Sequence, residues 1–187
     1  KELLDELFKN HDLVFGACNR GLMGVAYNAA LNNKRNITGI CPRVYKDDFN
    51  TLKCDKEIIV DSTLERLEAV FKESDIMLFL PGGIGTYSEL FSAIESRRSG
   101  EFESPIILYN SNGFFDKFNE MMSLNHGENF SKQDDFTNYI VLNSKQDVIK
   151  ACNSYVKPDY KKSYLHLILH NEAQDFQNKD MPVRHRQ

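Results

Sequence analysis

Short apolar runs alternate along the chain with longer segments in which apolar residues recur every three or four positions. The runs are β-branched or aliphatic at nearly every position, which is typical of strands buried on both faces. They predict strands at 13–16, 36–42, 57–60, 75–80, 105–110 and 139–144. The segments between them predict helices at 21–33, 62–73, 86–99, 113–124 and 144–156.

This alternation predicts an α/β fold, a parallel sheet covered by helices on both faces. Right-handed crossovers place every loop from a strand to the next helix at the same carboxyl edge of the sheet. Ligands of such sheets bind at that edge. We therefore look for functional residues in the loops that follow the strands.

Two regions do not follow the alternation. Residues 43–56 are a long polar connection, which we expect to be a surface loop that could cover a site. Residues 158–187 begin at Pro158, contain the apolar stretch "SYLHLILH" and end in a polar tail. The expected organisation is one domain over residues 1–157, followed by a C-terminal extension over 158–187.

Composition narrows the function classes. The length of 187 residues suits a single core, and the formal net charge of −4 lacks the basic footprint of a nucleic-acid-binding protein. No apolar run approaches the roughly 20 residues of a membrane span, so no membrane association is expected. Four scattered cysteines without a CxxC pair indicate a reducing compartment, the cytoplasm. The chain opens on Lys1 rather than Met, and we expect its natural start to lie further upstream.

A glycine-rich loop, "PGGIG", joins the predicted strand at 75–80 to the helix expected to start at about Thr86. Glycines allow a ligand to approach the backbone closely, and the first N–H groups of a helix carry partial positive charge. Together they form an anion site, most often for phosphate. Thr86-x-x-Glu89 is also a capping box, and the two interpretations can coexist, with the carboxylate of Glu89 held beside the bound anion.

A second glycine loop, "FGACNRGLMG", also follows a strand and opens a helix. Its glycines, Gly16, Gly21 and Gly24, do not have the GxGxxG spacing of a dinucleotide site. A tight turn, with close helix packing at Gly24, explains these glycines as well as a bound ligand does. Taken with the other loop, it predicts two helix N-termini facing one crevice.

The helix predicted at 62–73 starts with Ser62 or Thr63 as its cap and carries Arg66 in or near its first turn. A surface arginine that reaches water is one interpretation. The other is a guanidinium directed into the crevice, where its planar donors could meet a phosphate or a base edge.

These motifs together resemble the Lonely Guy (LOG) family, nucleotide hydrolases that activate cytokinins and were long described as lysine decarboxylases. "PGGIGTYSE" fits the family's PGGxGTxxE motif, "GLMG" at 21–24 matches its GLMG loop, and "ERLEA" aligns with the helix that carries its Arg-Lys pair. The resemblance covers about three quarters of the chain and implies a modified Rossmann fold in a homodimer.

The resemblance also implies a reaction, the cleavage of the N-glycosidic bond of a nucleoside 5′-monophosphate to free base and ribose 5-phosphate, without a cofactor or a metal. Arg66 and Glu89 fall on the family's catalytic residues. Our hypothesis is that Glu89 acts as the electrostatic and base residue and Arg66 as the positioning cation. The implied substrate-binding and phosphate-binding positions are Gly21, Met23, Gly82, Gly83, Ile84, Gly85 and Thr86.

The sequence departs from the family pattern in four respects. Leu67 replaces the lysine that follows the arginine, and "GAC" at 16–18 replaces a GGG. "SRRSG" at 96–100 replaces a Trp-Ala-Gln-Leu-Gly stretch, and the family's first strand would precede Lys1. A nucleotide-binding sensor or carrier without turnover is therefore the alternative, and a transferase acting on a phosphorylated ribose is a third candidate. No lysine in a pyridoxal-phosphate context supports a decarboxylase.

Three further features have simpler interpretations. His166 and His170 have the spacing of two metal ligands on one helical face, but no third ligand is evident. The apolar residues around them are better explained by packing against a neighbouring segment or a dimer partner. Cys18 lies beside a helix N-terminus, and we expect a small buried filler rather than a reactive thiol. Arg97 and Arg98 are expected on a solvated face that could reach a partner's site.

Overall fold

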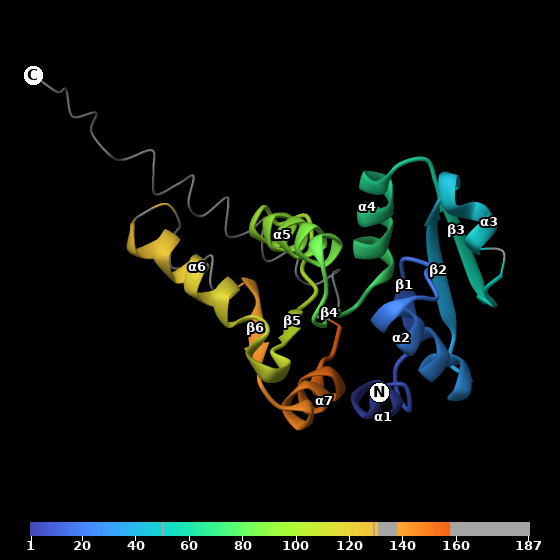
Figure 1. The fold of residues 1–187 in the computed structure, drawn as a ribbon, viewed down its shortest axis with the longest axis horizontal. Coiled ribbons are helices and arrows are strands. Elements are labelled where there is room, and N and C mark those ends of the chain that lie inside the picture. The colour runs from blue at the N-terminus through green and yellow to red at the C-terminus, as the bar shows by residue number, and fades with distance from the viewer. Residues whose placement is uncertain (50, 129, 131–137, 158–187) are drawn as a thin grey trace, which may run out of the picture. The chain divides into compact units, whose positions relative to one another are not determined.

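The computed structural model describes residues 1–49, 51–128, 130 and 138–157. The chain divides into a unit over Lys1–Tyr155 and a second unit over Val156–Gln187. The proposed C-terminal extension, 158–187, lies outside the described residues. The architecture below is that of the first unit (Figure 1).

The first unit contains six strands and seven α-helices in its described residues. The strands are β1 (Leu13–Phe15), β2 (Ile37–Pro42), β3 (Lys56–Val60), β4 (Met77–Phe79), β5 (Ile106–Tyr109) and β6 (Ile140–Leu142). The helices are α1 (Glu2–Leu7), α2 (Gly21–Asn32), α3 (Lys46–Phe49), α4 (Thr63–Glu73), α5 (Ile84–Arg98), α6 (Asp116–Gly127) and α7 (Lys145–Ser154).

The strands form two parallel sheets of three, where the sequence predicted one. The first has the order β1-β2-β3 and the second β4-β5-β6. Figure 1 shows the first sheet with α2, α3 and α4 and the second with α5, α6 and α7. If β1 of the first sheet lay beside β4 of the second, the strand order would be 3-2-1-4-5-6, the order of a doubly wound fold. The predicted α/β class is confirmed, and among the described strands no ladder joins β1 to β4.

The second sheet is covered on both faces, as the apolar strands predicted. Alternate strand residues point to opposite sides of a sheet, so Phe79 and Leu108 pack with the aromatic cluster of α5 and α6. Leu78 and Ile107, from the same two strands, pack instead with α1 and α7. Helices α2 and α4 contact the strands of the first sheet.

Helix α1 was not predicted from the sequence, and it contacts the cores of both sheets. Leu4 and Phe8 belong to the core of the first sheet, together with α2. Leu3 and Leu7 belong to the core of the second sheet, together with α7. A six-residue helix without a side-chain cap is weak on its own, so these contacts on two sides determine its place.

Two other sequence predictions need correction. The connection 43–56 is not a free surface loop, since it holds a 3₁₀ turn at Arg43–Tyr45 and helix α3, and the buried Leu52 anchors it in the first core. Helix α6 begins at Asp116 rather than at 113. Asn112 and Gly113 have positive φ angles of 54° and 73°, which interrupt a right-handed helix there.

Candidate active site

Three loops at the carboxyl ends of strands bring the predicted site residues toward one another. They connect β1 to α2, β3 to α4 and β4 to α5. β1 and β3 belong to the first sheet and β4 to the second, and side-chain contacts of Arg66 with Gly16 and Glu89 join the three loops. The three loops therefore supply, in turn, the first glycine loop, the arginine and the second glycine loop with its glutamate.

The start of α4 is well defined and holds Arg66. Ser62 caps the helix, with its hydroxyl accepting a hydrogen bond from the N–H of Glu65 at 3.1 Å. Glu65 reaches back in turn, and its Oε2 accepts from the N–H of Asp61 at 2.9 Å. These paired bonds fix the first turn. Arg66 follows directly, and its N–H donates to the carbonyl of Ser62 at 3.1 Å.

Helix α5 starts two residues earlier than predicted, because Gly83 rather than Thr86 is its N-cap. The N–H groups of Thr86 and Tyr87 both donate to the carbonyl of Gly83. The predicted capping box at Thr86-x-x-Glu89 is therefore wrong, since Thr86 lies inside the helix. Within the described residues, no protein group accepts a hydrogen bond from the N–H groups of Ile84 and Gly85.

The glycines of this loop have two different roles. Nothing lies within 4 Å of the position that a Cβ on Gly83 or Gly85 would take, so the helix N-terminus is open to solvent. A Cβ on Gly82 would lie 2.0 Å from Oγ1 of Thr86. Gly82 thus allows the loop to pack against Thr86, while Gly83 and Gly85 leave free access to the exposed donors of Ile84 and Gly85.

The central contact of the site joins Arg66 to Glu89. Nη2 of Arg66 donates to Oε1 of Glu89 at 2.6 Å, across 23 residues of sequence. The two side chains are 21% and 37% exposed. Burial raises the pKa of Glu89, the neighbouring guanidinium lowers that pKa, and the effect of burial is the larger, so the pKa lies above 4.5. Glu89 is thus a carboxylate tuned toward accepting a proton.

The first glycine loop reaches the same place through Gly16. A Cβ on Gly16 would lie 2.6 Å from Nη1 of Arg66 and 3.8 Å from the sulfur of Met23. Gly24 has the packing role that the sequence left open, because a Cβ there would lie 2.8 Å from the backbone of Asn19. The loop therefore packs closely against the helix at Gly24 and forms a wall of the site at Gly16.

A groove of about 680 Å³ runs between the edges of β1 and β4 and ends at the site. All three residues of each of these strands line it, and Leu4 and Leu7 of α1, with Phe8 directly after it, contribute further apolar surface. At the carboxyl end of the two strands its lining includes Gly16, Met23, Thr86 and Glu89. Its middle is thus apolar, and charged residues line it again near the amino ends of the strands, among them Asp12, Arg35 and Glu73.

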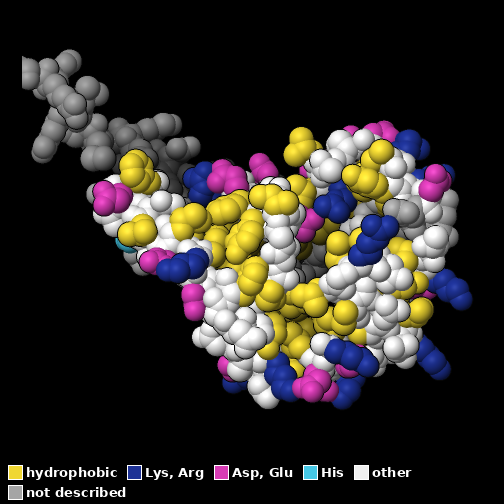
Figure 2. Space-filling model, in the orientation of Figure 1, with side chains coloured by type: hydrophobic (Ala, Val, Ile, Leu, Met, Phe, Trp, Pro, Cys, Tyr) yellow, Lys and Arg dark blue, Asp and Glu magenta, His cyan; other side chains and the backbone are white. Residues whose placement is uncertain are grey.

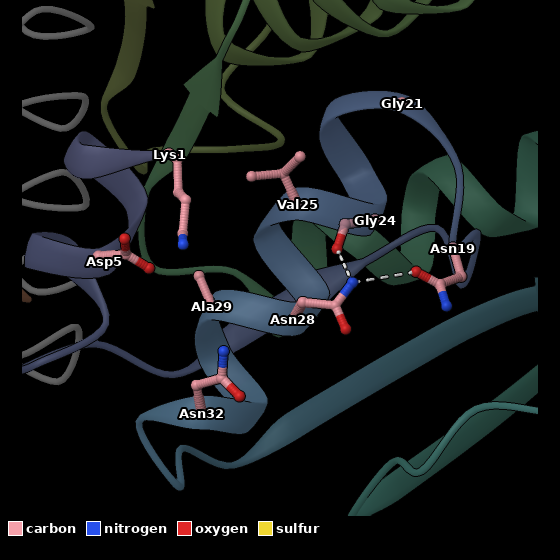
Figure 3. Close-up of a pocket in the computed structure, with 9 residues that line it drawn as sticks. All are labelled: Lys1, Asp5, Asn19, Gly21, Gly24, Val25, Asn28, Ala29 and Asn32. Atoms are coloured by element: carbon pink, nitrogen blue, oxygen red, sulfur yellow. Dashed lines mark hydrogen bonds between the residues drawn. The ribbon is translucent and has the colours of Figure 1, made fainter.

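Gly21 does not belong to this groove. It has a positive φ of 57° and lines a separate pocket of about 350 Å³ between α1 and α2 (Figure 3). There Asn28 donates to the carbonyl of Gly24 at 2.7 Å and to Oδ1 of Asn19 at 3.4 Å. The bond to Asn19 ties the loop to the helix, so the pocket is part of the loop's packing.

The other candidates from the sequence have different surroundings. Arg97 donates to the carbonyls of Glu103 and Ser104, and thus ties down the segment after α5 rather than facing only solvent. Cys18 is a half-buried thiol. His166 and His170 lie outside the described residues. Among the residues that the structure does describe, no three His, Cys, Asp or Glu side chains gather in a metal-binding arrangement, and no helix has the length and apolar content to cross a bilayer.

The structure thus brings Met23, Thr86 and Glu89 to one groove end, with Arg66 bonded to Glu89. Gly82, Gly83, Ile84 and Gly85 form the adjoining loop and helix start. Sequence reasoning noted Gly16 as a loop glycine but missed its contact with Arg66. No local signal could have found it, because the two residues are distant in sequence.

Comparison with known proteins places the chain in one family. The family model described as "Possible lysine decarboxylase" matches residues 23–152. The cytokinin riboside 5′-monophosphate phosphoribohydrolase LOG2 of Arabidopsis thaliana is 34% identical over 109 residues, 58% of this chain and 51% of that protein. The LOG enzyme of the same description from Oryza sativa subsp. japonica is 28% identical over 162 residues, 86% of this chain. The match spans 65% of the rice protein.

Among solved structures, the molybdenum cofactor carrier protein MCP from Chlamydomonas reinhardtii has a similar fold. The two structures superpose with a TM-score of 0.57 at 19% sequence identity, over 81% of this chain and 82% of that one. At this identity the likeness concerns the fold alone, and it agrees with the parallel sheets and flanking helices described above.

Proposed function

Because the chain belongs to the LOG family, we propose that it hydrolyses the N-glycosidic bond of a nucleoside 5′-monophosphate, releasing free base and ribose 5-phosphate. The observation that carries this proposal is the contact of 2.6 Å between Arg66 and Glu89 at a groove end beside an exposed helix N-terminus. The substrate class is AMP or a cytokinin riboside monophosphate, the latter named for the plant relatives.

The 5′-phosphate is proposed to bind at the start of α5. The N–H groups of Ile84 and Gly85 point out of the first turn, and the helix dipole adds partial positive charge. Gly83 and Gly85 carry no side chain that could obstruct a phosphate oxygen. This local site compensates for the overall negative charge of the chain.

Glu89 is proposed to act on the ribose and on water. As the bond from C1′ to the base nitrogen breaks, positive charge develops on the ribose ring, and the carboxylate stabilises it. The base leaves with the electron pair of the broken bond and takes a proton from solvent. A water molecule then forms the new C1′–O bond and gives its proton to Glu89, which returns it to solvent. A carboxylate with a raised pKa suits this role, because it is a stronger base than an ordinary glutamate.

A second candidate function is nucleotide binding without turnover. Two observations favour it: Leu67 stands where the family has a lysine, and "GAC" at 16–18 replaces the family's GGG in the first glycine loop. A protein of this kind would bind a nucleoside monophosphate at the same groove end and release it unchanged.

The test is to incubate the full chain with a panel of nucleoside 5′-monophosphates, including AMP and isopentenyladenosine monophosphate, and to measure free base and ribose 5-phosphate. We expect release of base from at least one nucleotide. Binding of a nucleotide without release would support the second candidate and refute turnover.

The variant Glu89→Gln should lower base release by about 10²-fold or more, since it removes the proposed base, while nucleotide binding persists. Glu95→Gln is the matched control, because Glu95 lies on the same helix and pairs with Arg98 on an exposed surface. Full activity in Glu89→Gln would refute its role.

The domain limits and assembly remain proposals. We propose residues 1–157 as the catalytic domain, in the cytoplasm, which agrees with the thiol state of all four cysteines. We also propose a homodimer formed through α5 and α6, where hydrophobic side chains gather on the surface (Figure 2). Phe91 and Leu124 are exposed there. Sedimentation of the full chain should give a dimer, and Leu124→Asp should shift it toward the monomer.

A further inference from the structure

The guanidinium of Arg66 lies against the backbone of Gly16. A Cβ built on Gly16 would be 2.6 Å from Nη1 and 3.5 Å from Cζ of Arg66. Side-chain carbons do not approach other heavy atoms at 2.6 Å, so the guanidinium occupies the space that any residue other than glycine would fill. Gly16 directly follows β1, and Arg66 comes from α4, so the contact joins two of the three loops of the site.

Few other contacts hold the guanidinium in place. Nη2 bonds to Glu89, whereas Nε is buried with no hydrogen-bond partner among the described residues. An arginine side chain has several rotatable bonds, and a single hydrogen bond does not fix its orientation. Packing against the flat backbone at Gly16 therefore supplies the second restraint.

We propose that Gly16 is a positioning residue: the absence of a side chain at this point seats the Arg66 guanidinium against the loop after β1, with Nη2 directed at Glu89. The effect on the reaction rate rests on the proposed function. The effect on the position of Arg66 and on the charge state of Glu89 does not.

A methyl group added at Gly16 would displace the side chain of Arg66 and leave the fold unchanged. The clashing atoms are the far end of a long, flexible side chain, which can swing away, and Gly16 does not have the positive φ that would strain an alanine. Gly16→Ala is therefore expected to fold with Arg66 moved away from Glu89.

The consequence for Glu89 has a definite sign. Among the described residues, Arg66 is the charged group that acts on this carboxylate, and it lowers the pKa, while burial raises it. When the guanidinium moves away, the lowering is lost and the pKa of Glu89 rises further. A change in Gly16 thus acts on Glu89 without touching it.

The experiment is a double-mutant cycle on the full chain. The pKa of Glu89 is measured by ¹³C NMR titration in the wild type, Gly16→Ala, Arg66→Ala and the double variant. We expect each single variant to raise the pKa of Glu89, and Gly16→Ala to add nothing once Arg66 is alanine. Gly127→Ala is the matched control, because nothing lies within 4 Å of its added Cβ, and it should leave the titration unchanged.

Two results would overturn the proposal: an unchanged pKa of Glu89 in Gly16→Ala when Arg66→Ala raises it, or an effect of Gly16→Ala that persists in full without Arg66. If Gly16→Ala does not fold, the double variant Gly16→Ala/Arg66→Lys tests whether the clash with Arg66 is the cause. Lysine lacks the Nη1 atom that the new methyl group would meet. Recovery of the fold supports the proposal, and failure of both variants refutes it.

Activity is read separately. If the wild type releases base, Gly16→Ala should lower kcat by about 10²-fold, the effect of a misplaced site group, and change KM less. If the wild type releases no base from any nucleotide, the proposed function fails, and the titration still decides the role of Gly16.

Discussion

Arg66 and Glu89 form a pair whose strength depends on their surroundings. Neither side chain is fully buried, at 21% and 37% exposure, so solvent weakens the attraction between them. Burial still has the larger effect on Glu89 and raises its pKa. The pair therefore contributes little to the stability of the fold.

The acidic limb of the pH profile of kcat/KM should lie above 4.5, because the base must be ionised and its pKa is raised. Arg66→Ala removes the influence that lowers this pKa, so the limb should move to higher pH. Steady-state kinetics across pH measures the shift.

Arg43→Ala is the control for this profile, because Arg43 pairs with Asp61 on an exposed surface. Its acidic limb should coincide with that of the wild type. A limb that stays in place or moves to lower pH in Arg66→Ala would contradict the assignment of Glu89 as the base.

Two helices present the site, and they begin in different ways. Helix α4 starts at Ser62, whose hydroxyl satisfies a backbone donor. Helix α5 starts at Gly83, which has no side chain and leaves donors exposed. A capped helix holds a side chain in place, whereas an uncapped one keeps its N–H groups available for an anion. Each start suits the role proposed for its helix.

Ser62→Ala should cost about 1 kcal/mol of unfolding free energy, as the loss of an N-cap does. It should also lower base release, because the first turn of α4 carries Arg66. Urea denaturation and the base-release assay measure the two effects.

Ser144→Ala is the matched control, since Ser144 caps α7 in the same way, accepting from the N–H of Asp147 at 3.1 Å. It should cost a similar free energy and leave activity unchanged. Equal loss of activity in both variants would show that the start of α4 has no special role in the site.

Within the whole first unit, the two sheets share one short helix. Leu4 of α1 and Phe8 directly after it pack in the first core, and Leu3 and Leu7 in the second. No hydrogen bonds join β1 to β4 among the described strands. The stability of both halves therefore depends on α1, which contributes different leucines to the two cores.

Leu7→Ala should cost about 2 to 5 kcal/mol, as truncation of a buried leucine does. Hydrogen exchange should speed up in both sheets, since α1 contacts both cores. The control is Leu64→Ala, a leucine that is 72% exposed on α4 and should change stability little. Faster exchange confined to the second sheet would contradict a shared role for α1.

The alternation of strands and helices could be predicted because it depends on local patterns. Every predicted strand and helix has a counterpart in the structure. The boundaries of α5 and α6 could not be placed correctly, since Gly83 and Asn112 act through backbone geometry that the apolar pattern does not record. Helix α1 was missed because long-range packing, rather than its own sequence, holds it.

The sequence by itself determined the α/β class, the family, and the kinds of residue at the loops, because periodicity and glycine chemistry are properties of neighbouring residues. Only the tertiary structure decided that Arg66 meets Glu89 across 23 residues, that Gly16 makes room for the guanidinium, and that Gly21 lies in another pocket. Such contacts join segments far apart in the chain, and their distances follow from how the strands and helices pack.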